Sequence, residues 1–164
     1  MSRPFRVRRS PIHGNGVFAT RPIPAGTELI EYTGKLITRA EADELYDEVY
    51  SGHTFLFTLH GDWIIDANRG GNDARWINHG CEPNCLPVLY EDEQDPLKDQ
   101  IFILALRDIQ KGEELTYDYG ISFDIPYTEE LKQIWACHCG APGCTGTMLK
   151  PPDHERDTAG ADVE

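Results

Sequence analysis

Three cysteines near the end of the chain have the spacing of a metal-binding knuckle. Cys137, Cys139 and Cys144 form a C-x-C-x4-C pattern, and the glycines and proline between them favour tight turns. Thiolates are the soft ligands that zinc accepts, and a tetrahedral site needs a fourth ligand beside these three. The spacing therefore predicts a structural zinc site that is completed by another residue.

The chain offers three sources for the fourth zinc ligand. Cys81 and Cys85 lie far upstream, whereas His138 lies directly beside Cys137, and adjacent residues rarely both reach one ion. These residues favour a cysteine without deciding between Cys81 and Cys85. The total of five cysteines is odd, which excludes a complete set of intramolecular disulfides. We expect metal binding in a reducing, intracellular compartment.

Two other parts of the chain contain residue types that can surround a ligand or a reacting group. The glycines of His13-Gly14-Asn15-Gly16 let backbone groups approach a ligand, or simply form a tight turn. This segment lacks the third glycine and the βαβ setting of a dinucleotide site. Tyr32, Tyr117 and Tyr119 end apolar segments, where phenols can converge on a pocket or pack as core aromatics.

The elements that carry these residues are mostly strands. Short segments rich in apolar, β-branched and aromatic residues, bounded by Gly, Pro and Asn, indicate a mainly β fold with short helices. The segments with this pattern are Gly16–Thr20, Thr27–Tyr32, Lys35–Thr38, Thr54–His60, Trp63–Asp66, Gln100–Arg107 and Glu114–Tyr119. Thr38 and Glu41 form a capping box ahead of apolar residues at helical spacing, and residues 128–135 predict a second helix.

The length and the charge of the chain limit the classes of protein to which it can belong. The 164 residues suit one domain, and neither a membrane span of about 18 apolar residues nor a secretory signal is predicted. The net charge of −13, with acid concentrated at Glu41–Glu48 and Glu91–Asp99, argues against direct binding of nucleic acid and favours a basic protein or peptide as partner. The alternative is that the acid serves only solubility. The oligomeric state stays open.

The order of the motifs resembles one family of enzymes. R-W-I-N-H-G-C-E-P-N-C at residues 75–85, E-L-T-Y-D-Y at 114–119 and C-x-C-x4-C at 137–144 together resemble the SET-domain protein lysine methyltransferases. The resemblance covers about residues 6–149. These enzymes transfer a methyl group from S-adenosyl-L-methionine to a lysine side chain, so the resemblance implies this reaction here.

The resemblance also implies an architecture. We expect a SET-domain β-fold at residues 5–120, with pseudoknot-like threading of its C-terminal segment. A post-SET zinc-binding segment should follow at 121–149. Residues 150–164, which are rich in Pro, Gly and charge, predict a disordered tail. Because all five thiols follow residue 80, we expect no cysteine-rich pre-SET region and a minimal stand-alone version of the fold.

Ligand-binding roles follow from the same resemblance. Cys81 would join Cys137, Cys139 and Cys144 around the zinc ion, which leaves Cys85 as a buried free thiol. The residues at the family's cofactor positions would hold S-adenosyl-L-methionine: Gly14, Asn15, Gly16, Phe55, Arg75, Asn78 and His79.

By the same resemblance, three tyrosines would form the channel in which the lysine reacts. Tyr119 would be the catalytic phenol at the channel floor, with Tyr32 and Tyr117 as lining. In-line transfer needs a neutral amine about 3 Å from the methyl group. Desolvation and the sulfonium charge lower the pKa of the lysine, so no strong general base is required. The Tyr117 hydroxyl can hold a water in the space of an extra methyl group, which predicts mono- to dimethylation.

The sequence thus predicts a lysine methyltransferase for a basic protein such as a histone or a histone-like protein. The compartment would be the cytoplasm, or the nucleus and chromosomes if the substrate is a histone. Two other hypotheses compete: a catalytically silent SET-fold module that binds peptides, and a zinc-stabilised scaffold. The presence of all the expected polar residues argues against the silent module. The scaffold hypothesis predicts that no cofactor binds.

Overall fold

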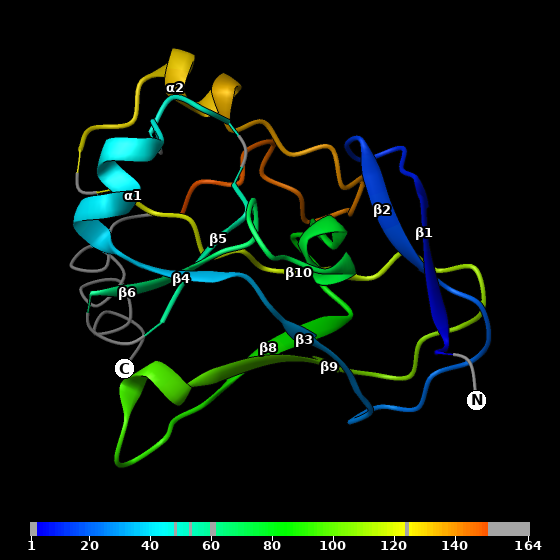
Figure 1. Ribbon diagram of the computed structural model, residues 1–164. Helices are drawn as coiled ribbons and strands as arrows, with labels where there is room; N and C mark the ends of the chain where they lie inside the picture. Colours follow the sequence, from blue (N-terminus) through cyan, green and yellow to red (C-terminus); the bar gives the residue numbers. More distant parts are fainter. Residues whose placement is uncertain (1–2, 48, 53, 60–61, 124, 151–164) are drawn as a thin grey trace, which may run out of the picture.

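The strands of this protein are short and spread over several small sheets (Figure 1). The computed structural model describes residues 3–150, apart from residues 48, 53, 60–61 and 124. A mainly β fold with short helices is confirmed. No helix within the described residues is long and apolar enough to cross a membrane. The tail expected at 151–164 lies outside the described residues, and the domain boundaries and the threading stay predictions.

Two antiparallel sheets form the right-hand and lower parts of the molecule in Figure 1. β1 (Phe5–Arg9) pairs with β2 (Asn15–Ala19), and β9 (Gln100–Ala105) lies between β3 (Glu28–Tyr32) and β8 (Cys85–Tyr90). Alternate residues of β9 are buried, as expected for a strand with one face on the core. The sequence pattern does not predict β8, because Pro87 interrupts it. Proline is tolerated there because β8 is at the edge of its sheet.

Two further pairings carry residues of the candidate site. β6 (Trp63–Asp66) lies between β4 (Lys35–Thr38) and β5 (Leu56–Thr58), and all three are antiparallel to their neighbours. β7 (Asn78–His79) and β10 (Thr116–Tyr117) form a parallel pair of two residues each. The strands β5 and β10 are shorter than the sequence pattern predicts, and β7 is not predicted at all.

The capping box predicts the start of the first helix correctly. Thr38 Oγ1 accepts a hydrogen bond from the Glu41 N–H at 3.1 Å, and the Glu41 carboxylate accepts one from the Thr38 N–H at 3.3 Å. The helix α1 (Arg39–Leu45) follows this cap, and its buried alanine packs on β4 and β6. Single 3₁₀ turns are formed by η1 (Asp73–Trp76) and η2 (Pro96–Lys98).

The second predicted helix holds the C-terminal segment against the body of the protein. α2 (Glu129–Ile134) begins at the N-cap Thr128. Trp135, which follows it, is 1 % exposed, packs with Leu149 in a small apolar cluster, and donates its indole N–H to the carbonyl of Val49 at 2.7 Å. This cluster positions the segment that contains the cysteine knuckle.

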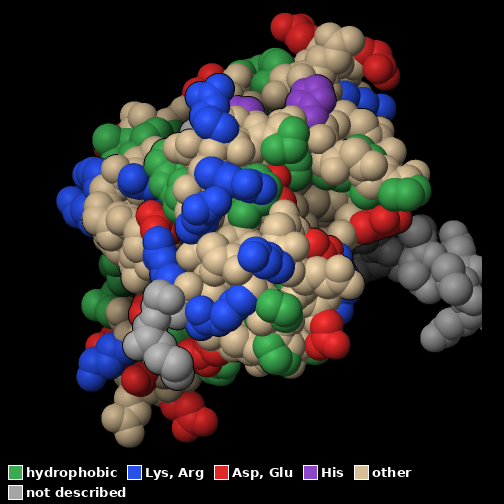
Figure 2. All heavy atoms as spheres, turned by 90° about the vertical axis from the view of Figure 1, so that its right-hand side faces the viewer, with side chains coloured by type: hydrophobic (Ala, Val, Ile, Leu, Met, Phe, Trp, Pro, Cys, Tyr) green, Lys and Arg blue, Asp and Glu red, His purple; other side chains and the backbone are tan. Residues whose placement is uncertain are grey.

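Charge is unevenly distributed over the surface. Figure 2 shows Lys and Arg side chains gathered on the side of the molecule that contains β1 and β2. The helix α1, on the opposite side in Figure 1, contains Glu41, Asp43 and Glu44. The exposed arginines of β1 and the carboxylates of α1 therefore lie on different sides of the molecule.

Candidate active site and metal centre

Two neighbouring cavities share part of their walls. The first, called the Asn78 cavity, has a volume of about 480 Å³ and is lined by the β1–β2 loop, η1, β7 and the segment after α2. The second, called the tyrosine cavity, has a volume of about 580 Å³ and is lined by α1, β5 and the segment that begins at β10. Thr54, Tyr119 and Trp135 line both cavities. Both volumes are typical of sites for small molecules or side chains.

The side-chain amide of Asn78 is held in one orientation. Its Nδ2 donates to the carbonyls of His13 (3.2 Å) and Asn15 (3.0 Å) and to Glu114 Oε2 (2.9 Å). All three neighbours are acceptors, so the amide must present its NH₂ group to them. The carbonyl oxygen Oδ1 is then the atom that Asn78 can offer to a ligand, as an acceptor for an N–H group.

Glu114 fastens this asparagine to the β1–β2 loop. Its two carboxylate oxygens each lie 2.8 Å from Ser10 Oγ, which donates to them, and Ser10 Oγ accepts from the Ile12 N–H at 2.9 Å. A Cβ atom at Gly16 would lie 2.4 Å from Glu114 Oε2, so only glycine allows this approach. No role for Glu114 is predicted from its sequence context, although it lies in the E-L-T-Y-D-Y motif.

The other predicted cofactor residues lie around the same cavity, with one exception. Gly14 and Asn15 line it, and Gly14 has a φ of 46°, which favours glycine. Gly16 is buried behind it against Glu114 and does not line it.

Two aromatic rings and a guanidinium complete the wall of the Asn78 cavity. Phe55 packs edge to face on Trp76, with ring centroids 5.2 Å apart. The Arg75 guanidinium lies 4.6 Å from the centre of the Trp76 ring and donates to the Ala67 carbonyl at 3.3 Å. The cavity therefore combines apolar ring surface with fixed polar groups, as ligand sites commonly do.

His79 connects the phenol side of the site to the thiols. Its Nδ1 accepts a hydrogen bond from the Tyr119 N–H at 3.1 Å, so the proton of the neutral ring is on Nε2. Nε2 lies 3.8 Å from Cys81 Sγ. His79 is 3 % exposed, and this burial lowers the pKa of its ring, although the nearby Asp118 opposes the effect. A neutral imidazole thus holds the backbone of the central tyrosine.

The three predicted tyrosines come together around the tyrosine cavity. Tyr117 and Tyr119 have ring centroids 4.8 Å apart, and Phe57 contacts both Tyr117 and Tyr32. The Tyr119 hydroxyl donates to the carbonyl of Ile77. Burial raises the pKa of all three phenols above the ordinary value, so they stay protonated at neutral pH. They act as neutral hydrogen-bonding groups and not as bases.

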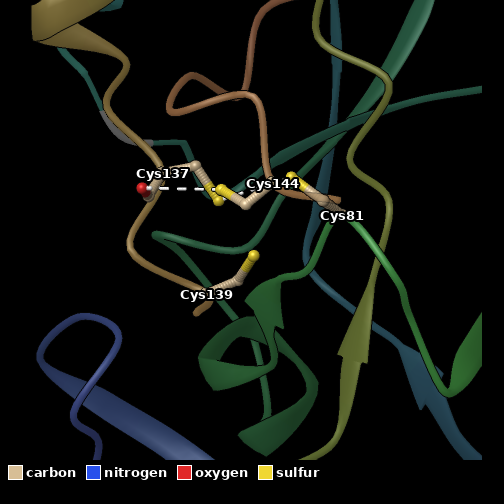
Figure 3. Close-up of side chains that lie close together, drawn as sticks. All are labelled: Cys81, Cys137, Cys139 and Cys144. Carbon is tan, nitrogen blue, oxygen red and sulfur yellow. Dashed lines mark hydrogen bonds between the residues drawn. The ribbon is translucent and has the colours of Figure 1, made fainter. Parts of the chain in front are cut away.

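Four thiols converge where the C-terminal segment meets the loop after β7 (Figure 3). The sulfur atoms of Cys81, Cys137, Cys139 and Cys144 all lie within 4.8 Å of one another, and those of Cys81 and Cys137 are 3.7 Å apart. Zn–S bonds of about 2.3 Å in a tetrahedron require sulfur atoms about 3.8 Å apart. The donor set and its spacing therefore fit one zinc ion, as predicted.

Of the candidates for the fourth ligand, only Cys81 lies with the three other thiols. Cys81 is in the cluster, while Cys85 begins β8 and is a buried free cysteine, as expected. Burial raises the pKa of the Cys85 thiol to about 12. His138 is exposed and lines the Asn78 cavity, and it does not belong to the four-thiol group.

This chain belongs to the SET domain family. The family model, described as the SET domain, matches residues 14–120, which is more than half of the chain. The match includes Gly14, β2, β7 and β10, and therefore most of the residues that surround the two cavities. The resemblance of the motifs to the SET-domain family is therefore confirmed.

Curated relatives cover nearly the whole chain but are much longer. "Histone-lysine N-methyltransferase ATX2" of Arabidopsis thaliana is 41 % identical over 164 residues, which is 95 % of this chain and 14 % of that protein. "Histone-lysine N-methyltransferase, H3 lysine-4 specific" of Candida albicans is 39 % identical over 149 residues, 89 % of this chain and 14 % of the relative. "Histone-lysine N-methyltransferase trr" of Drosophila melanogaster is 41 % identical, with 87 % and 6 % covered. The chain spans 14 % or less of the length of these relatives.

The thiol cluster predicts a sharp contrast between two neighbouring cysteines. Protein purified with zinc should contain roughly one zinc ion per chain, as a four-thiolate structural site requires. Cys81→Ser and Cys139→Ser should lose most of this metal and unfold at a lower temperature, because metal binding contributes folding free energy. Cys85→Ser should keep it. Metal content by mass spectrometry decides the question, and full zinc occupancy in Cys81→Ser would contradict this ligand set.

Proposed function

We propose that this chain transfers a methyl group from S-adenosyl-L-methionine to the side-chain amine of a lysine in a basic protein. The main observation in support of the proposal is that Tyr119 lines both the Asn78 cavity and the tyrosine cavity. A donor in the Asn78 cavity and a lysine in the tyrosine cavity would approach each other beside this one phenol. The names of the relatives state histone-lysine methylation, and one states H3 lysine 4, which makes histone H3 the first substrate to test.

The Asn78 cavity suits the methyl donor in size and in polarity. Asn78 Oδ1 would accept a hydrogen bond from the ammonium group, while the backbone of Gly14 and Asn15 offers further polar contacts. The rings of Phe55 and Trp76 offer apolar surface to the adenine. When bound, the donor supplies a methyl group on a sulfonium. The residues of the chain hold it in place and exclude water.

The tyrosine cavity suits a neutral lysine amine. Tyr32 and Tyr117 are 3 % and 5 % exposed, so an amine between them loses most of its hydration. Desolvation lowers the pKa of a lysine, and a nearby sulfonium lowers it further. The amine would therefore shed its proton to water before it reacts, and the protonated phenols orient it by hydrogen bonds.

A basic partner fits the acid beside the tyrosine cavity. Asp43 and Arg39 of α1 line this cavity, and with Glu41 and Glu44 the helix has three carboxylates against one guanidinium. The acidic segment at residues 91–99 connects β8 to β9 and lines neither of the two cavities. We therefore assign the attraction of a basic peptide to α1. With a histone as substrate, the protein would act inside the cell on chromatin.

Glu114 should matter for binding of the methyl donor, because it holds both Asn78 and the β1–β2 loop. Glu114→Ala should weaken binding of S-adenosyl-L-methionine by about tenfold, equivalent to the loss of about one good buried hydrogen bond. Glu114→Gln should weaken it less, since an amide can still accept from Asn78. Glu113→Ala is the matched control, because Glu113 pairs with Arg107 instead. Calorimetry that finds equal losses for Glu113→Ala and Glu114→Ala would contradict this role.

Tyr119→Phe tests the proposed reaction directly. The substitution keeps the ring but removes the hydroxyl that orients the amine, so transfer should slow by roughly 100-fold or more while donor affinity changes little. Tyr90→Phe, on the distant strand β8, should react like the unmodified chain. Transfer of a labelled methyl group to histone H3 and to other basic proteins is the measurement.

Three results of that assay and of calorimetry of donor binding would count against the proposal. Unchanged turnover in Tyr119→Phe would remove the phenol from the reaction. Donor binding without transfer to any basic protein would indicate a silent peptide-binding module. Failure to bind the donor at all would indicate a scaffold.

The product should be mainly monomethyl-lysine, with some dimethyl-lysine. Tyr117 is 5 % exposed and packs beside Tyr119, so a water held by its hydroxyl would occupy the space that a methylated amine needs. Tyr117→Phe should release that water and shift the products toward di- and trimethyl-lysine, with a similar first transfer. Mass spectrometry of a peptide with one lysine measures the distribution. Trimethyl-lysine as the main product of the unmodified chain would show that other residues set the limit.

A further inference from the structure

The charge of this chain is sharply divided along the sequence. The first 27 residues contain five arginines and no Asp or Glu. All 28 acidic residues and the other ten of the 15 basic residues come later. A segment of charge +5 thus precedes a remainder of charge −18, and the net charge of −13 conceals this division. Such asymmetry is typical of chains that contact polyanions.

The fold brings these arginines to one side of the molecule. β1 carries Arg6, Arg8 and Arg9, all exposed, with Arg3 just before it and Arg21 just after β2. We call these five residues the arginine face, and Figure 2 looks onto this side of the molecule. Because side chains alternate along a strand, Arg6 and Arg8 point to one face of β1 and Arg9 to the other, but all three are exposed on the side of the molecule away from α1.

Three members of the arginine face, Arg3, Arg8 and Arg21, already interact with the protein. Arg3 pairs with Asp73, and the Arg8 guanidinium lies 3.9 Å from the centre of the Phe18 ring, which it covers. Among the described residues, Arg6 and Arg9 have no ion-pair partner. Their guanidinium groups are open to a ligand, and the planar donor fork of arginine matches phosphate oxygens.

The surroundings of the arginine face argue against a membrane and against a single-stranded nucleic acid. None of the large exposed apolar side chains of the described residues belongs to residues 3–27, so the segment that carries the arginines has no such group to insert into a lipid surface. Single strands are bound by stacking bases on exposed aromatic rings. The aromatic residues here, Phe5 and Phe18, are 3 % and 6 % exposed. An open, apolar-poor surface of arginines fits the phosphate backbone of a duplex.

We propose that the arginine face binds the phosphate backbone of duplex DNA without sequence preference. The choice of DNA over an RNA duplex rests on the proposed function, because a histone substrate is bound to DNA. The net charge of −13 argues against binding of nucleic acid, but it is the sum of a basic N-terminal segment and an acidic remainder. Binding should be weak and strongly dependent on salt, because the remaining acid repels DNA beyond the contact region.

The test measures binding of the full chain to a labelled DNA duplex of about 30 base pairs by fluorescence anisotropy, at several salt concentrations. The dissociation constant should be on the order of 10⁻⁵ M at low salt, and log K should fall with log salt with a slope of about −2, as for phosphate contacts of Arg6 and Arg9. No methyl transfer is involved, so this result stands apart from the test of the reaction. Absence of binding at low salt would overturn the proposal.

Two double variants separate the arginine face from net charge. Arg6→Gln with Arg9→Gln should weaken binding about tenfold or more and reduce the salt slope by about two. Lys35→Gln with Lys98→Gln changes net charge equally, at exposed positions outside the face, and should bind like the unmodified chain. Equal losses in the two pairs would overturn the proposal. Circular dichroism checks that each variant is folded. If a variant does not fold, the salt slope of the unmodified chain still tests the proposal.

Two further ligands exclude the alternatives. The unmodified chain should not bind vesicles that contain phosphatidylserine, and it should prefer the DNA duplex to a single strand of the same length. Binding to vesicles but not to DNA would assign the face to an anionic membrane. A clear preference for the single strand would overturn the assignment to a duplex.

Discussion

A parallel pairing of only two residues per strand holds the candidate site together. β7 and β10 place His79 beside Tyr117, but so short a pair has few backbone hydrogen bonds of its own. Side chains complete it, because Asn84 Oδ1 accepts from the Thr116 N–H at 2.9 Å and His79 Nδ1 accepts from the Tyr119 N–H. Buried polar groups that are fully paired make a region rigid and specific. The ligand cavity, the phenols and the thiol loop therefore keep fixed positions relative to one another.

Local patterns were enough to predict several parts of this arrangement. The cap at Thr38 depends on residues three positions apart, and the thiol knuckle depends on the spacing of Cys137, Cys139 and Cys144. The choice of Cys81 over Cys85 came from family resemblance, because spacing alone leaves both open. These features could be predicted because each is decided within a short segment or by a recurring motif.

Contacts between distant segments could not be predicted in the same way. Ser10 and Glu114 are 104 residues apart, and no periodicity marks either as a partner of the other. Trp135 lies at the end of a predicted helix, and nothing in the sequence indicates that its indole N–H donates to the Val49 carbonyl, 86 residues away. β8 is not predicted because proline is rare in strands except at the edge of a sheet, and the sequence does not show that β8 is an edge strand. Each case depends on tertiary packing that overrides a local preference.

The four-thiol site limits what metal can do in this protein. Four thiolates fill a tetrahedral zinc ion and leave no open position for a substrate, so the ion would stabilise structure instead of polarising a reactant. Its place matters nonetheless, because Cys137 and its neighbours line the Asn78 cavity while Cys81 follows β7. Zinc binding would join the two sides of that cavity and contribute folding free energy to its wall. In the proposed reaction the chemistry would then come from orientation and desolvation beside Tyr119, where protonated phenols could align an amine but could not take its proton.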